Sequence, residues 1–233
     1  MAEKMNDIVY ILRQGKNEEL RYSLRSVCKN FPYKRVIIYG GKPDDIEPDW
    51  FIPYTQPGSS KWGKVRNTVR AVCKNDNITE DFWLFNDDFF IMKPVENPTN
   101  YYDGTLRERI AVIEKQLFGH HSDYSNLLRH LARTLERAGV ENPLNYAHHT
   151  PMLINRKKMA DILERYPNEP MFRALYGNIA QIGGENMPDV KFYQNRQPWP
   201  IGTYASTADE SWRTEKIGQI IRGKFSTRCK YEA

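Results

Sequence analysis

Two adjacent carboxylates, Asp87 and Asp88, are the side chains of this sequence best suited to chemistry. They follow the apolar run Phe82–Phe85 and are followed at once by Phe89 and Phe90. A run that is apolar on both faces predicts a buried strand of a parallel sheet, and open α/β sheets bind ligands at the carboxyl ends of such strands. Two unpaired carboxylates are costly to bury, whereas Mg²⁺ or Mn²⁺ prefers carboxylate oxygens and bridges to phosphates. We therefore predict a metal site for a phosphorylated ligand at Asp87 and Asp88. The alternative is a tight turn with both carboxylates in solvent.

Two neighbouring histidines, His148 and His149, precede a short apolar run that begins at Pro151 and predicts a strand. In an extended chain they project to opposite faces, so at most one is expected to enter a site. That one could be a metal ligand or a general base. The alternative is a hydrogen-bonding histidine of the core.

The first ninety residues alternate between strand and helix patterns that would position the acidic pair. Apolar runs rich in β-branched and aromatic residues predict strands at Ile8–Leu12, Arg35–Tyr39 and Phe82–Phe85. Asn17 is predicted to cap a helix between the first two strands, and a loop is predicted over residues 42–60. A second helix is marked by the apolar residues Trp62, Val65, Val69 and Val72. This order predicts an α/β fold with a parallel, doubly wound sheet.

The second half of the chain is predicted to be more helical. Ser122 is a candidate cap for a helix that would end before Gly139. Two further helices are marked by Leu106, Ile110, Ile113 and Leu117, and by Met159, Ile162, Leu163 and Tyr166. No repeat or linker divides the sequence, so we expect one domain over residues 1–233. Residues 1–95 would form the ligand-binding half, and residues 96–233 would cover and complete the site.

Composition and cysteine count narrow the class of protein. The 233 residues are 40% hydrophobic, and the longest apolar runs are too short for a membrane span. The N-terminus lacks the apolar region of a signal peptide, so we expect a cytoplasmic protein. The three cysteines, Cys28, Cys73 and Cys229, are widely spaced and indicate neither a zinc site nor a disulfide framework. Cys28 and Cys73 are predicted to be core residues of helices.

Basic side chains form two stripes at a spacing of four residues. One stripe consists of Arg66, Arg70 and Lys74, and the other of Arg129, Arg133 and Arg137. Such stripes can follow a phosphate backbone, and the net charge of +5 is compatible with an anionic partner such as DNA. The alternative is two solvated helix faces.

Several common enzyme motifs are absent, whereas the acidic pair resembles a known one. The sequence contains no Gly-x-Gly-x-x-Gly, no P-loop pattern and no Gly-x-Ser-x-Gly, which disfavours dinucleotide oxidoreductases, P-loop nucleotidases and serine hydrolases of that type. An apolar strand that ends in an acidic pair resembles the GT-A glycosyltransferases. More narrowly, three blocks resemble the Stealth family of sugar-phosphate transferases, in that family's order: Glu19–Ser26, Leu84–Phe90, and His149–Pro151 followed by Asn155 and Arg156.

The resemblance implies a GT-A-like, Rossmann-type fold and a glycosyltransferase that moves a hexosyl or pentosyl group from a nucleotide sugar, first of all a UDP-sugar. Asp87 and Asp88 would hold Mn²⁺ or Mg²⁺ on the diphosphate, and Asn86 would orient their loop. The nucleotide would lie near Arg13 and Gln14, and the diphosphate contacts would come from Arg21 and Arg66. The general base would be His149, which could instead be a third metal ligand, or a carboxylate from the second half, Glu185 or Asp189.

The acceptor separates the remaining interpretations. Stealth proteins start with a Trp-Val-Asn-Gly-like turn after the first strand, where this chain has Leu12–Gly15. A compact chain with these blocks also resembles bacteriophage glycosyltransferases that decorate DNA. This resemblance implies hydroxymethylated bases as acceptor and, if a phage encodes the protein, the host cytoplasm as its location. Alternatives are a Stealth-like sugar-phosphate transferase acting on a glycan, and a non-catalytic DNA-binding protein that uses the basic stripes.

Overall fold

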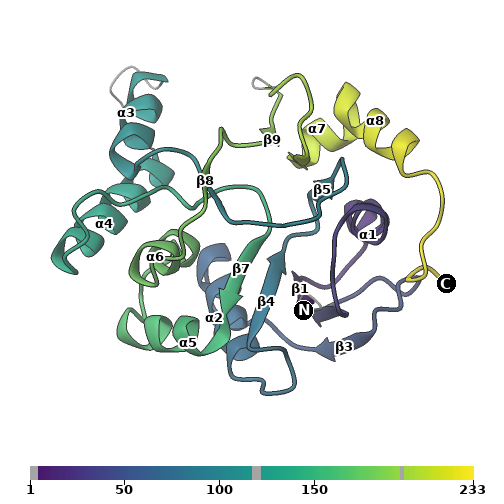
Figure 1. Cartoon of the computed structure of the whole chain (residues 1–233), viewed down its shortest axis with the longest axis horizontal. Helices are drawn as coiled ribbons and strands as arrows, with labels where there is room; N and C mark the ends of the chain where they lie inside the picture. Colours follow the sequence, from purple (N-terminus) through teal and green to yellow (C-terminus); the bar gives the residue numbers. More distant parts are fainter. Residues whose placement is uncertain (1–4, 117–121, 195–196) are drawn as a thin grey trace.

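A computed structural model describes residues 5–116, 122–194 and 197–233 (Figure 1). The strands are β1 (Asp7–Leu12), β2 (Val36–Gly40), β3 (Trp50–Pro53), β4 (Asp81–Phe85), β5 (Phe89–Ile91), β6 (Tyr101–Tyr102), β7 (Met152–Asn155), β8 (Glu185–Asn186), β9 (Lys191–Phe192) and β10 (Tyr204–Thr207). The helices are α1 (Glu18–Asn30), α2 (Lys61–Cys73), α3 (Leu106–Gln116), α4 (Asp123–Arg137), α5 (Arg156–Arg165), α6 (Phe172–Ile179), α7 (Asp209–Thr214) and α8 (Lys216–Lys224). Leu117, predicted as part of the third helix, lies outside the described residues.

The main sheet is mostly parallel, as the sequence predicted. Its strand order is β3-β2-β1-β4-β7; neighbouring strands are parallel except that β7 runs antiparallel to β4. The prediction of a loop over residues 42–60 is wrong, because this segment contains β3. That strand has four half-buried or exposed residues at the sheet edge, so it lacks the apolar run that marks the central strands.

Alternate residues of the central strands enter two cores on opposite faces of the sheet. Ile8 and Tyr10 of β1 pack in one core with residues of α1, whereas Val9 packs in the other with residues of α2 and α5. Figure 1 shows α1 on one side of the sheet and α2 on the other. The run that is apolar on both faces is therefore explained by burial from two sides.

The predicted helix caps are confirmed. The Asn17 side chain accepts a hydrogen bond from the backbone N–H of Leu20 (3.1 Å), and Ser122 forms a reciprocal capping box with Ser125 at the start of α4. Gly139 follows α4 with a φ of +84°, the left-handed conformation that ends many helices.

A second, smaller sheet brings the end of the chain to the end of β4. The chain turns after β4 into β5, which pairs antiparallel with β10, and β10 pairs with β9. These strands pack with α7 and α8 in a third core. The short strands β6, β8, β9 and β10 were not predicted, because two to four residues carry no recognisable alternation. No described helix is long and apolar enough to cross a membrane.

Candidate functional site

The acidic pair lies at the point where the main sheet changes direction. From β1 the chain continues to β2 and β3 on one side, whereas β4 and β7 lie on the other. Arg13 follows β1 and Asn86 follows β4, so both lie at the carboxyl ends of neighbouring strands, the usual ligand position in such sheets. Residues 86–88 form a turn into β5, closed by a hydrogen bond from the Phe89 N–H to the Asn86 carbonyl (3.3 Å). A tight turn is thus present, but its acids are not in solvent: Asp88 is only 9% exposed and Asp87 is half-buried.

Asp88 is held by two donors from the second sheet. Its Oδ2 accepts hydrogen bonds from Lys191 Nζ (2.6 Å) and from Ser206 Oγ (2.9 Å). The pairing of β5 with β10 sets Ser206 opposite Phe89, which explains why these groups meet. Burial raises the pKa of Asp88, but the charges of Lys191 and His149 and the two hydrogen bonds lower it, and the net shift is downward. Asp88 is therefore a carboxylate beside a buried ammonium.

Asp87 binds the start of α1. Asn17 Nδ2 donates to Asp87 Oδ2 (2.5 Å), so the amide that caps the helix also fastens it to the acidic turn. Burial, and then the neighbouring charge of Asp88, raise the pKa of Asp87, whereas the Asn17 hydrogen bond and the charge of Arg13 lower it less. The two carboxyl groups of the pair therefore differ, because the pKa of Asp87 is raised and that of Asp88 is lowered.

A third carboxyl group, that of Glu19, is close enough to Asp87 and Asp88 for their charges to act on it. Its Oε1 accepts a hydrogen bond from Thr207 Oγ1 (2.5 Å). Burial is the largest cause that raises the pKa of Glu19 to about 7, against the Thr207 hydrogen bond, and the charges of Asp88 and Asp87 add to the increase. Sequence analysis placed Glu19 in the first Stealth-like block but did not select it as a site residue.

His149 is oriented by Asp189. The His149 Nδ1 lies 3.0 Å from each carboxylate oxygen of Asp189, and the His149 backbone N–H donates to Asp189 Oδ1 (3.1 Å). Burial raises the pKa of Asp189, but these interactions outweigh it and lower the pKa well below its usual range. A carboxylate at Nδ1 favours the proton on that nitrogen and leaves Nε2 as an acceptor. His148 points to other partners, Thr150 Oγ1 (3.1 Å) and the Met187 carbonyl (3.0 Å), and burial lowers its pKa, which is typical of a core histidine.

Arg173 joins this cluster from α6, and sequence analysis missed it. Its Nη2 donates to the Thr150 carbonyl (2.5 Å), its guanidinium lies 5.7 Å from the Phe89 ring centroid, and within the described residues its Nε has no hydrogen-bond partner. Burial lowers the pKa of Arg173 to about 10, although the charges of Asp88 and Asp189 raise it. A cation close to both carboxylates is therefore part of the site.

The other predicted site residues divide into two groups. Arg13, Gln14 and Asn86 are exposed at the ends of β1 and β4, and the charge of Arg13 acts on Asp87. Among the described residues, neither Arg21 nor Glu185 forms a hydrogen bond or ion pair with Asp87 or Asp88. The Arg21 guanidinium pairs with Asp45 and lies 3.6 Å from Glu232, and Glu185 is exposed on β8.

Arg66 lies in a separate hollow of about 350 Å³ at the start of α2. The hollow is lined by Gly58, Ser59, Ser60, Gly63, Arg66, Asn67, Asn168 and Pro170. Burial, and then the charge of Arg70, lower the pKa of Arg66. The contact of Arg66 with a diphosphate stays a prediction.

The donor atoms fit a cation only in part. In the described ranges no group of three or more His, Cys, Asp or Glu residues could hold a metal ion. Asp87 and Asp88 accept their side-chain hydrogen bonds at Oδ2, so each Oδ1 lacks a side-chain donor in the described part of the chain. Two such oxygens suit Mg²⁺ or Mn²⁺, which complete their coordination with water and substrate phosphates.

The basic stripes are not uniform charged faces. Arg70 Nη2 donates to the Leu163 carbonyl (2.8 Å), and Arg129 is paired with Glu114. Lys74, Arg133 and Arg137 are exposed. The interpretation as solvated faces therefore holds for part of each stripe only.

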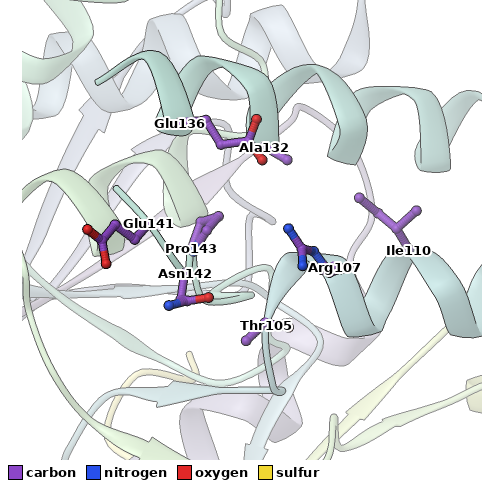
Figure 2. A pocket seen from close by; sticks show the side chains of 8 residues that line it. All are labelled: Thr105, Arg107, Ile110, Ala132, Glu136, Glu141, Asn142 and Pro143. Atoms are coloured by element: carbon purple, nitrogen blue, oxygen red, sulfur yellow. The ribbon is translucent and has the colours of Figure 1, made fainter. Parts of the chain in front are cut away.

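A further cavity of about 180 Å³ lies between α3 and α4, and no residue of the acidic turn lines it. It is lined by Thr105, Arg107, Ile110, Ala132, Glu136, Glu141, Asn142 and Pro143 (Figure 2). None of the predicted site residues lines it.

Comparison with solved structures identifies the fold. Galactosyltransferase LgtC in complex with donor and acceptor sugar analogs is 11% identical with a TM-score of 0.54, and the match covers 96% of each chain. An active-site mutant of LgtC gives 12% identity and a TM-score of 0.50, over 96% of this chain and 98% of that one. The apo form of glycosyltransferase GlyE from Streptococcus pneumoniae TIGR4 is 10% identical with a TM-score of 0.47. That match covers 96% of this chain, which spans only 61% of the length of GlyE. No family model and no curated protein sequence matches. The fold is thus α/β and similar to that of GT-A glycosyltransferases, which confirms the predicted fold class.

Proposed function

We propose that this protein is a metal-dependent glycosyltransferase that transfers a sugar from a nucleotide sugar, first of all a UDP-sugar, to a hydroxyl group. The observation that supports it is the acidic pair of half-buried Asp87 and buried Asp88 at the switch point of a GT-A-like sheet, with one oxygen of each carboxylate lacking a side-chain donor among the described residues. An oxygen without a side-chain donor remains available to a cation.

The donor would lie across the carboxyl ends of β1 and β4. Asp87 and Asp88 would hold Mn²⁺ or Mg²⁺, which supplies Lewis-acid neutralisation of the charge on the leaving nucleoside diphosphate. Arg13 and Gln14 would lie beside the nucleotide, and Asn86 would keep the turn in place through its carbonyl. Lys191, which neutralises Asp88 in the free protein, would become available to a phosphate oxygen when a cation takes over that role.

His149 is the candidate for the acceptor side. With Nδ1 directed to Asp189, its Nε2 could accept the proton of an attacking hydroxyl or bind the cation. Asp189 then acts as a positioning residue, because its carboxylate is already used by His149. Glu185 has no part in this proposal.

Turnover tests the proposal and distinguishes the kinds of transfer. The purified protein is incubated with a series of UDP-sugars and Mn²⁺, together with either a glycan or hydroxymethylated DNA as acceptor. DNA is included because its phosphates could bind exposed basic residues such as Arg133 and Arg137. We expect metal-dependent release of UDP that is lost in Asp88→Asn and kept in Asp161→Asn, a matched change at an exposed position of α5. Release of UMP would indicate transfer of a sugar phosphate. Release that is unaffected by chelation, or no release with any nucleotide sugar, would overturn the proposal.

A further inference from the structure

The C-terminal segment after α8 is fastened to α1 and to the loop before β3. Arg25 of α1 donates to both carboxylate oxygens of Glu232 (2.7 and 2.6 Å), and both side chains are less than a tenth exposed. The Glu47 backbone N–H donates to the Tyr231 carbonyl (2.8 Å), and Tyr231 Oη donates to Asp49 Oδ2 (2.6 Å). Figure 1 shows the C-terminal segment running down beside α1. The attachment rests on polar contacts between parts of the chain that are far apart in sequence.

Two free thiols lie close together where this segment passes α1. Cys28 of α1 and Cys229 are both half-buried and pack against the same core. The Cys229 backbone N–H donates to Glu232 Oε1 (3.0 Å), the carboxylate that Arg25 holds one helical turn before Cys28. The two thiols act on each other as a hydrogen-bonded pair. The Tyr33 hydroxyl lies 3.5 Å from Cys28 Sγ and 3.3 Å from Tyr231 Oη. Cys73 is instead fully buried in the core on the opposite face of the sheet.

We propose that Cys28 and Cys229 form a reversible disulfide that joins the C-terminal segment to α1 covalently. This inference does not depend on the proposed transferase activity. It differs from the expectation drawn from sequence, where Cys28 was a core residue of a helix and no disulfide was indicated. The spacing of the two cysteines could not show that the fold places them together.

The chemical environment makes Cys28 the attacking group. The hydrogen bond from Cys229 is the largest cause that lowers the pKa of Cys28 to about 7, with smaller contributions from Tyr33 and Lys230, against the opposing effect of burial. The same pairing and burial raise the pKa of Cys229. A thiol with a pKa near neutrality is the one that exchanges fastest with a disulfide at that pH.

The oxidant would be a small-molecule disulfide of the glutathione class. The Cys28 thiolate attacks one sulfur of that disulfide and expels the other as a thiolate, which leaves a mixed disulfide on Cys28. Cys229 then loses its proton and attacks the Cys28 sulfur, expelling the second small thiol. The protein loses two hydrogen atoms, and one disulfide is reduced to two thiols.

The test is equilibration of the whole native protein in glutathione buffers of increasing oxidised fraction, followed by acid quenching, alkylation and a non-reducing peptide map. We expect a peptide pair joined through Cys28 and Cys229, with a mass lower by two hydrogen atoms, and its loss on addition of dithiothreitol. Cys73 is the internal control and should be alkylated only after unfolding. The oxidised protein should also unfold at a higher temperature than the reduced one.

Single substitutions connect these readouts to the proposed bond. Cys28→Ser and Cys229→Ser should each abolish the cross-link and the change in unfolding temperature with redox state, whereas Cys73→Ser should keep both. The inference is overturned if the wild-type protein yields only free or singly glutathionylated Cys28 and Cys229. An equally frequent cross-link to Cys73, or an oxidised form no more stable than the reduced one, would also overturn it.

Discussion

Replacing Lys191 with methionine should destabilise the protein by about 3–5 kcal/mol, because it leaves the Asp88 carboxylate buried without its ammonium partner. The side chains of the pair are 15% and 12% exposed, and the contact is 2.6 Å, so solvent screens it little. Ser206 keeps its hydrogen bond to Asp88, which favours the lower end of that range. Methionine preserves most of the side-chain volume, so a packing defect should add little.

A double-mutant cycle separates the ion pair from packing. Asp88→Asn removes the charge that Lys191 neutralises, so Lys191→Met combined with Asp88→Asn should be more stable than the sum of the single changes by about 2 kcal/mol or more. The free energy of unfolding is measured by urea denaturation of all four proteins.

The pH dependence of the single variant adds a second criterion. In the wild type, the lowered pKa of Asp88 contributes stability that is present above the ordinary carboxyl value of about 4 and is lost as the pH falls. In Lys191→Met the pKa of Asp88 should rise, so the difference from wild type should shrink as the pH is lowered. A loss below about 1 kcal/mol, strict additivity, or a difference that grows in acid would refute the reasoning.

Three further changes test other parts of the structure. Glu19→Gln should be more stable than wild type above pH 7, by up to about 3 kcal/mol, and equal to it below pH 4.5. The reason is that the raised pKa of Glu19 costs the wild type stability as the pH rises between these values, and urea denaturation at several pH values measures the difference. Arg25→Met should cost about 3–5 kcal/mol by leaving buried Glu232 without its bidentate partner, and a thermal melt that is unchanged would contradict the proposed attachment. Gly40→Ala should destabilise strongly, since φ is +125° and the new Cβ would lie on a carbonyl oxygen of β1, whereas Gly223→Ala in α8 meets nothing and should be neutral or stabilising in the same assay.

Local patterns predicted the elements that carry the acidic turn. The two-faced apolar run before Asn86 is buried from both sides, and the Asn17 and Ser122 caps formed as predicted, since these signals depend on neighbours within a few residues. The same reasoning predicted a parallel sheet and the place of Asp87 and Asp88 at its edge.

Partners that come from distant short segments could not be predicted. Lys191 lies on a two-residue strand and Arg173 on a helix of eight residues, and neither segment has a pattern that indicates which way its side chain points. Arg21 was chosen from the resemblance. It stands two positions after Glu19 in the first Stealth-like block, and on a helix this spacing directs it to Asp45. Its contact with a diphosphate stays a prediction.

Equilibrium binding of Mn²⁺ and UDP to the free protein tests the central claim most directly. Calorimetric titrations are made with UDP in the presence of Mn²⁺ or chelator, on wild type, Asp87→Asn, Asp88→Asn and the control Asp161→Asn. We predict that UDP binds tightly only with Mn²⁺, that UDP strengthens Mn²⁺ binding by the same factor, and that both effects disappear in the first two variants alone. UDP affinity that is equal with Mn²⁺ and with chelator, and unchanged when Asp87 or Asp88 is replaced, would contradict a metal–diphosphate site at this turn.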